Sequence, residues 1–141
     1  MHFSLIDAVL ECDEKHIVTI KHVTSAEEYL KDHFPTFPIL PGVMMLEAMV
    51  QAGRALLTNN DNTARRHVLG QVKALKYGAM VKPGDSLRVE LELVKQEDDT
   101  ATFKGRCLRI GASSLDQSAD TAASGRFTLR PIRTLHPIDT T

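Results

Sequence analysis

Hydrophobic and polar residues alternate along much of the chain, and this alternation predicts strands. In the centre of Asp85–Gln96, leucine and valine occupy every second position and charged residues lie between them, as in an antiparallel strand with one buried face. His16–Val23 alternates β-branched with polar residues in the same way. Three more strands are predicted near His67–Tyr77, Thr100–Ile110 and Thr121–Arg130. Turns between strands are expected at Pro83-Gly84-Asp85 and Asp98-Asp99.

The longest apolar segment, Val43–Leu57, predicts a helix of about four turns, because it is rich in methionine, leucine and alanine. It is apolar nearly all round, which is typical of a helix buried within a protein. The residues before it follow a stiff, extended path, since Pro35, Pro38 and Pro41 occur at every third position. One long helix followed by antiparallel strands predicts a single α+β domain over residues 1–141, with the sheet wrapped around the helix.

Shorter elements complete the predicted fold. Ser4–Leu10 is expected to form a short amphipathic helix or turn, and the capping-box pair Ser25 and Glu28 predicts another brief helix. Asn59–Thr63 is predicted to be a turn, and Gly111–Ala119 a polar loop that is long for a hairpin.

Composition narrows the function classes. The net charge of −1 argues against general nucleic-acid binding. The longest apolar run is interrupted by Pro41, Gly42 and Glu47, and no basic stretch precedes a hydrophobic segment at the N-terminus. We therefore expect a cytoplasmic protein without a membrane span or secretory signal, with Cys12 and Cys107 as reduced thiols. No glycine-rich phosphate motif and no metal-ligand spacing appears, so neither a metal nor a cofactor is expected.

The segment from position 62 to 84 contains no acidic residue. Its basic residues are Arg65, Arg66, Lys73, Lys76 and Lys82. They are either solvated strand and loop positions or a basic face that receives an acidic partner.

Polar residues on the predicted buried helix need an explanation. Glu47, Gln51, Arg54 and Thr58 follow one another at spacings of four, three and four, so they form one narrow stripe. The stripe either faces water, with Glu47 paired to Gln51 or Arg54 for structural reasons, or it presents the Glu47 carboxyl to a substrate.

Two further features precede this stripe. Gly42 lies at the predicted helix start, where backbone N–H groups are unpaired, the helix dipole is positive and a ligand oxygen can approach closely. His33 directly precedes the proline-rich path, and imidazole is well suited to general-base chemistry. A histidine base, a carboxylic acid and an oxyanion-binding helix start together match the needs of β-elimination from an acyl thioester.

The segment from His33 to Gln51, HFPTFPILPGVMMLEAMVQ, closely resembles the signature of bacterial β-hydroxyacyl-(acyl carrier protein) dehydratases. That signature is H-F-P-x-x-P-x-x-P-G-V, followed by a Glu-Ala pair and a Gln four residues after the Glu. Lys76–Leu87 resembles the family's K-[FY]-x-x-x-V-x-P-G-D-x-L stretch, and Phe3–Glu11 resembles its opening helix. Thr36 departs from the family, which commonly has glycine there, and this bears on the shape of the pocket.

The resemblance implies a hot-dog fold with Val43–Leu57 as its central helix. It implies a homodimer with shared active sites, in which His33 of one subunit is the base and Glu47 of the other the acid, and in which Gly42 and Val43 bind the thioester carbonyl. It further implies an acyl carrier protein as partner, received at the basic stretch, and a possible trimer of dimers. With Glu rather than Asp at position 47, the chain resembles the elongation-type enzyme, which does not isomerise the double bond.

Two other function classes stay open from the sequence. One is a hot-dog acyl-thioester hydrolase, and the other is a non-catalytic acyl-binding or scaffold subunit. The acyl chain length, and the choice among fatty-acid, lipid A and polyketide synthesis, are also left open.

Overall fold

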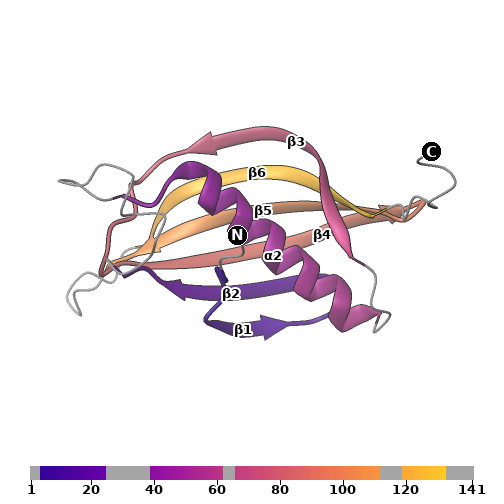
Figure 1. The fold of residues 1–141 in the computed structure, drawn as a ribbon, viewed down its shortest axis with the longest axis horizontal. Coiled ribbons are helices and arrows are strands. Elements are labelled where there is room, and N and C mark those ends of the chain that lie inside the picture. Colours follow the sequence, from indigo (N-terminus) through magenta and orange to yellow (C-terminus); the bar gives the residue numbers. More distant parts are fainter. Residues whose placement is uncertain (1–3, 25–38, 62–65, 112–118, 133–141) are drawn as a thin grey trace, which may run out of the picture.

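Six antiparallel strands form one sheet in the part of the chain that the computed structural model describes, residues 4–24, 39–61, 66–111 and 119–132 (Figure 1). The strands are β1 (Ala8–Cys12), β2 (His16–His22), β3 (His67–Tyr77), β4 (Ser86–Glu97), β5 (Thr100–Ile110) and β6 (Ala119–Pro131). Their order across the sheet is β1-β2-β4-β5-β6-β3. Helix α2 (Gly42–Asn60) crosses one face of the sheet diagonally (Figure 1). The predicted α+β hot-dog architecture is therefore confirmed.

The core lies between α2 and the middle strands of the sheet. Phe103 and Phe127 are register partners on β5 and β6, and their rings stack with centroids 5.3 Å apart. On the facing side of the helix, Ala48 and Ala52 are fully buried. A Cβ added to Gly53 would lie 3.1 Å from the Leu129 side chain and 3.3 Å from that of Phe103. Small residues on the helix thus let its backbone approach the large residues of the sheet.

A glycine also makes room on the sheet beneath the helix. Gly105 lies opposite Leu91 on β4 and Gly125 on β6. A Cβ at Gly105 would collide with the Leu91 side chain, and it would lie 3.2 Å from the carbonyl oxygen of Glu90 and 3.4 Å from the sulfur of Met49 on α2. The absence of a side chain at this position therefore lets Leu91 and Met49 pack together.

The predicted strands are confirmed with small shifts at their ends, but the N-terminal prediction is wrong. Ser4–Leu10 does not form a helix, because Ala8–Cys12 is strand β1, paired with β2. Asp7 begins this pairing, with its N–H bound to the carbonyl of Ile20 and its carboxylate accepting the N–H of His22, at 2.8 and 2.7 Å. Pairing with a distant strand has overridden the local helical pattern.

The helix differs from its prediction in two ways. It continues to Asn60, so the start of the predicted Asn59–Thr63 turn is helical. The Asn60 amide donates to the carbonyl of Glu14 at 2.7 Å, which holds this last turn against the segment between β1 and β2. The helix is also not buried all round, because the sheet covers one side only and Val43 is 64% exposed. The brief helix predicted at Ser25 and most of the predicted Gly111–Ala119 loop lie outside the described residues.

No helix within the described ranges is long and apolar enough to cross a membrane.

We predict that Gly105→Ala lowers the free energy of unfolding by about 1–3 kcal/mol, because overpacking forces Leu91 or Met49 out of place. Denaturant unfolding followed by circular dichroism measures this change. The exposed neighbour Lys104 serves as the control, and Lys104→Ala is expected to change the free energy by less than about 0.5 kcal/mol. Equal stabilities of the Gly105→Ala and wild-type proteins would contradict this packing argument.

Candidate functional site

The start of α2 has backbone N–H groups without a side-chain partner among the described residues. Pro41 precedes it with an extended backbone (φ −61°, ψ 143°), and its carbonyl accepts the N–H of Met44 at 2.9 Å. No side-chain hydrogen bond caps this end within the described residues, and the first turn contains no acid. The N–H groups of the first turn and the positive end of the helix dipole are therefore available at Gly42 and Val43.

A backbone hydrogen bond fixes this helix start to the sheet. The N–H of Leu40 donates to the carbonyl of Val81 at 2.7 Å, and both side chains are buried. Val81 is the valine of the V-x-P-G-D stretch that the sequence analysis associated with the family. This stretch thus supports the segment that leads into the helix.

Asp85 holds the turn that follows Val81. Its carboxylate accepts the N–H of Lys82 at 3.0 Å and lies 3.5 Å from the Arg109 guanidinium. Gly84 has a positive φ of 98°, which favours glycine, and its N–H donates to the carbonyl of Val23 at 2.8 Å. The Pro-Gly-Asp turn is therefore a structural element rather than a source of reacting groups.

Tyr77, at the end of β3, lies against the helix start. A Cβ added to Gly42 would lie 2.7 Å from two ring carbons of Tyr77, so this position requires glycine to let the ring approach. The Tyr77 side chain is 53% exposed. In the sequence Tyr77 stands out only as part of the Lys76–Leu87 motif, and its position beside Gly42 adds it to the candidate site.

Glu47 lies one turn further along α2, with its side chain 40% exposed. Its Oε1 accepts a hydrogen bond from the Gln51 amide at 3.4 Å and lies 3.7 Å from an Arg54 guanidinium nitrogen. Gln51 in turn accepts the N–H of Leu5 through its own Oε1 at 2.7 Å. The predicted stripe thus exists as a cluster of three side chains, while Thr58 is exposed to solvent. Glu47 has structural partners and is also open to a substrate.

The predicted base, His33, lies outside the described residues, as does Thr36. The pairing of His33 with Glu47 therefore stays a prediction.

The described residues of the predicted basic stretch are spread along β3 and beyond both of its ends. Arg66 directly precedes β3, whereas Lys82 follows that strand, whose 11 residues span roughly 36 Å. Lys73 and Lys76 lie between them, opposite Arg126 and Ser124 of β6. Arg65 lies outside the described residues. Two of the described basic residues are next in sequence to contacts of the helix start: Lys76 precedes Tyr77, which lies against Gly42, and Lys82 follows Val81, which binds Leu40.

Cys107 is buried beneath α2, where its Sγ donates to the carbonyl of Met45 at 3.6 Å. Burial raises the pKa of the Cys107 thiol to about 12, and Cys12 is exposed on β1. No group of three metal-ligating side chains occurs in the described part of the chain.

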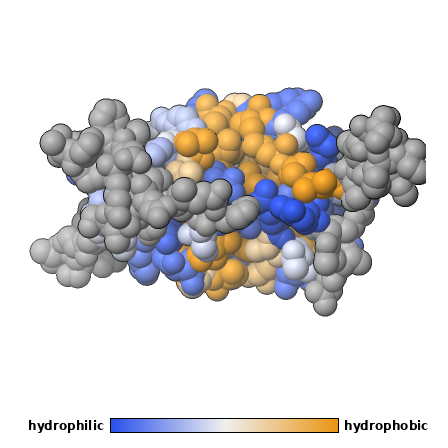
Figure 2. Space-filling view, in the orientation of Figure 1, coloured by the Kyte–Doolittle hydropathy of each residue, from blue (hydrophilic) through white to orange (hydrophobic). Residues whose placement is uncertain are grey.

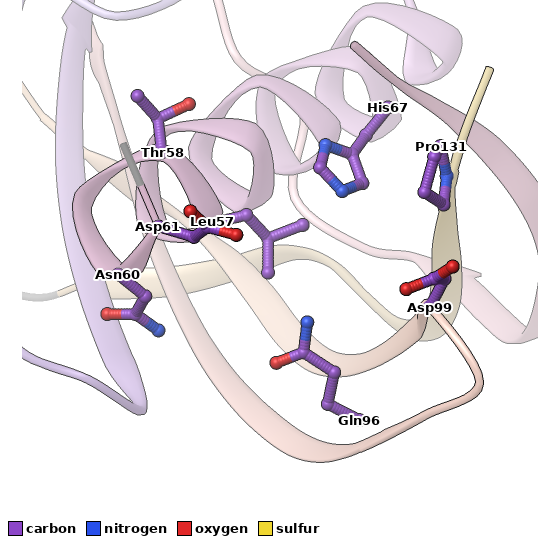
Figure 3. A pocket seen from close by; sticks show the side chains of 8 residues that line it. All are labelled: Leu57, Thr58, Asn60, Asp61, His67, Gln96, Asp99 and Pro131. Atoms are coloured by element: carbon purple, nitrogen blue, oxygen red, sulfur yellow. The ribbon is translucent and has the colours of Figure 1, made fainter. Parts of the chain in front are cut away.

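A cavity of about 270 Å³ lies at the opposite end of α2 (Figure 3). Its lining residues are Leu57, Thr58, Asn60, Asp61, His67, Gln96, Asp99 and Pro131. Leu57 is ten residues from Glu47, or roughly 15 Å along the helix. This cavity is therefore separate from the helix start.

Comparison with known proteins identifies relatives. The FabA-like domain family matches residues 1–112. A 3-hydroxyacyl-(acyl carrier protein) dehydratase FabZ of Bacillus cereus is 39% identical over 95 residues, which are 66% of this chain and 66% of that protein. The FabZ of a Geobacillus species is 36% identical over 105 residues, 73% of this chain and 72% of that protein. The chain thus aligns with about two thirds of the length of the Bacillus relative.

Solved structures show the same fold. The dehydratase heterocomplex ApeI:P of Xenorhabdus doucetiae superposes with a TM-score of 0.75 at 16% identity, covering 97% of this chain and 88% of that one. A thioesterase superfamily member of Thermus thermophilus superposes with a TM-score of 0.64 at 19% identity, covering 87% and 85%. At these identities the likeness concerns the fold.

Proposed function

The chain belongs to the FabA-like family, and on that premise we propose that it removes water from 3-hydroxyacyl-(acyl carrier protein) to give the trans-2-enoyl thioester. The observation that carries this proposal is the position of the half-exposed Glu47 carboxyl, five residues past a helix start at Gly42 that no described side chain caps. The names of the FabZ relatives support the same reaction. We place it in fatty-acid or related acyl synthesis, in the cytoplasm.

The mechanism assigns one task to each part of the site. The His33 imidazole takes the α-proton of the substrate, and the electron pair of that C–H bond moves toward the thioester carbonyl. The N–H groups of Gly42 and Val43 stabilise the charge on the carbonyl oxygen. The pair then forms the Cα=Cβ bond while the Cβ–O bond breaks, and Glu47 protonates the departing oxygen, which leaves as water. Proton exchange with solvent returns His33 and Glu47 to their starting states.

We further propose that each active site is formed by two chains, with His33 from one and Glu47 from the other. Strand β3 is an edge of the sheet and offers unpaired backbone groups. Figure 2 shows hydrophobic surface gathered in the middle of the helix-bearing face. Exposed apolar residues near this edge include Val43, Val72, Tyr77 and Met80. Covering them with a second copy related by a two-fold axis gives two identical sites, and three such dimers can assemble further.

A thioester hydrolase is the second candidate, because the fold is shared with a thioesterase superfamily member. The two reactions give different products. Dehydration yields an enoyl thioester and keeps the thioester bond, whereas hydrolysis releases a free thiol.

We predict that the wild-type protein converts a 3-hydroxyacyl thioester into an enoyl thioester without releasing thiol. His33→Ala should lower this rate by roughly 10²–10⁴-fold, since one base serves both reaction directions. Glu47→Gln should bind substrate but lose turnover, because the amide cannot supply the proton. Enoyl absorbance and a thiol reagent measure the two products. Near-normal turnover in either variant would remove that residue from the mechanism, and thiol release alone would favour the hydrolase.

We predict that mixing inactive His33→Ala with inactive Glu47→Gln protein restores roughly a quarter of wild-type activity after subunit exchange. With random pairing, half of the dimers are mixed, and each mixed dimer has one intact site and one doubly substituted site. Differently tagged subunits verify the exchange. Proven exchange without recovery would mean that both residues act within one chain.

We predict that the carrier protein docks near Lys82, so that Lys82→Glu raises KM for a carrier-linked substrate but not for a small thioester analogue. The effect should shrink with added salt, because surface charges are screened beyond about 8–10 Å near physiological ionic strength. Lys95→Glu is the matched control, because Lys95 is exposed near the far end of β4. Lys73→Glu and Lys76→Glu test whether the docking surface extends along β3. Equal effects of Lys82→Glu on both substrates would refute docking there.

A further inference from the structure

We propose that Arg54 is a positioning residue that, together with Gln51, fixes Oε1 of Glu47 and leaves Oε2 as the atom that protonates the departing β-hydroxyl. This inference rests on the function proposed above. It adds a residue of this chain that the elimination mechanism does not use, and it assigns different roles to the two oxygens of the acid.

Both contacts of Glu47 converge on one oxygen. The Gln51 amide nitrogen lies 3.4 Å from Oε1, and Nη1 of Arg54 lies 3.7 Å from the same atom. The first distance is that of a long hydrogen bond, and the second is a charge contact. No described residue makes a hydrogen bond to Oε2.

Each of the two contacting side chains is also held at a second point. Nε of Arg54 donates to the backbone carbonyl of His67, at the start of β3, at 2.9 Å. Oε1 of Gln51 accepts the backbone N–H of Leu5 at 2.7 Å. The Glu47 carboxyl is thus tied through one side chain to β3 and through the other to the N-terminal segment.

The chemistry of the two partners decides which oxygen carries the proton. A guanidinium group has N–H donors and no acceptor. The Gln51 amide could accept only through its own Oε1, which already accepts from Leu5, so it presents its NH₂ group to Glu47. An oxygen that faces two donors serves as an acceptor. A proton on the Glu47 carboxyl is therefore expected on Oε2, to which no described residue makes a hydrogen bond.

The effect of losing Arg54 should be moderate and confined to one step. Both Arg54 and Glu47 are close to 40% exposed, so water weakens their attraction and the pair contributes little to folding stability. Small displacements of a reacting group are costly to the rate, however. We expect Arg54→Ala to lower kcat about ten-fold with little change in KM.

A pair of substrates separates the acid step from the base step. 3-Hydroxybutanoyl-N-acetylcysteamine needs a proton on its leaving oxygen. In the 3-chlorobutanoyl analogue, chloride departs with the electron pair of the C–Cl bond and needs no proton, while the base still takes the α-proton. Both give the same enoyl thioester, which is followed by absorbance after subtraction of the uncatalysed rate.

With the full-length protein, Arg54→Ala should slow the hydroxy substrate about ten-fold and the chloro substrate less than two-fold. Arg54→Lys should recover part of the loss, because it keeps the positive charge, whereas Arg54→Gln should not. Glu47→Gln should show the same substrate selectivity more severely.

Arg106→Ala is the matched control. Arg106 is also an exposed arginine paired with a glutamate, since its Nε donates to Glu90 at 2.7 Å. Burial tends to raise the pKa of the Glu90 carboxyl, but the contacts with Arg106 and Arg88 outweigh it and hold that pKa below its usual range. This pair belongs to the sheet rather than to α2, so Arg106→Ala should leave both rates unchanged.

The outcomes are distinguishable. Equal slowing of both substrates by all three Arg54 variants, or no slowing at all, would overturn the positioning role while leaving the proposed function standing. A wild-type protein that eliminates water from neither thioester nor carrier-linked substrate would overturn the proposed function and this inference with it.

Discussion

Close packing between α2 and the sheet is the constraint on which the rest of the structure depends. The sheet side contributes large residues, among them Phe103 and Phe127, and the helix meets them with Ala48, Ala52 and Gly53. This match of large with small fixes the rotation of the helix about its own axis. Since successive helical residues are about 100° apart, burying Ala48 determines where Glu47 must lie, at the border between core and solvent.

Strand β3 contacts helix α2 at its start and near its middle. Its last residue, Tyr77, lies against Gly42, and its first residue, His67, accepts a hydrogen bond from Arg54. The Leu40–Val81 hydrogen bond adds a second attachment of the helix start, just beyond the end of this strand. Displacement of β3 would therefore alter the proposed oxyanion-binding end of the helix and the carboxyl cluster together.

The sequence was most informative where a pattern was long and regular. Alternation identified β2 to β6 closely, and the methionine- and alanine-rich segment identified α2. Alternation failed at Ala8–Cys12, because so short a stretch, apolar except for Glu11, is compatible with helix or strand until its partner is known, and that partner is β2. The ladder of backbone hydrogen bonds to Ile20 decides the outcome, and no local pattern contains that information.

The polar stripe on α2 was predictable in its residues but not in its contacts. Spacing on a helix placed Glu47, Gln51 and Arg54 on one stripe, since helical geometry is fixed. Gln51 and Arg54 both contact the same oxygen of Glu47. Their positions depend on Leu5 and on the carbonyl of His67, which are distant in the sequence. The position of the Tyr77 ring beside Gly42 likewise follows from the path of β3. Long-range backbone positions determine these details, whereas a motif records only residue types.

The two edges of the sheet differ in a way that limits how many chains can join. Strand β1 has five residues and one irregularity in its pairing with β2, whereas β3 has eleven residues and two irregularities in its pairing with β6. The edges therefore differ in length rather than in regularity. A short edge is a poor template for an incoming strand, because it offers few N–H and C=O groups. Polymerisation into open-ended fibrils through the sheet, which needs both edges, is disfavoured by the shortness of β1.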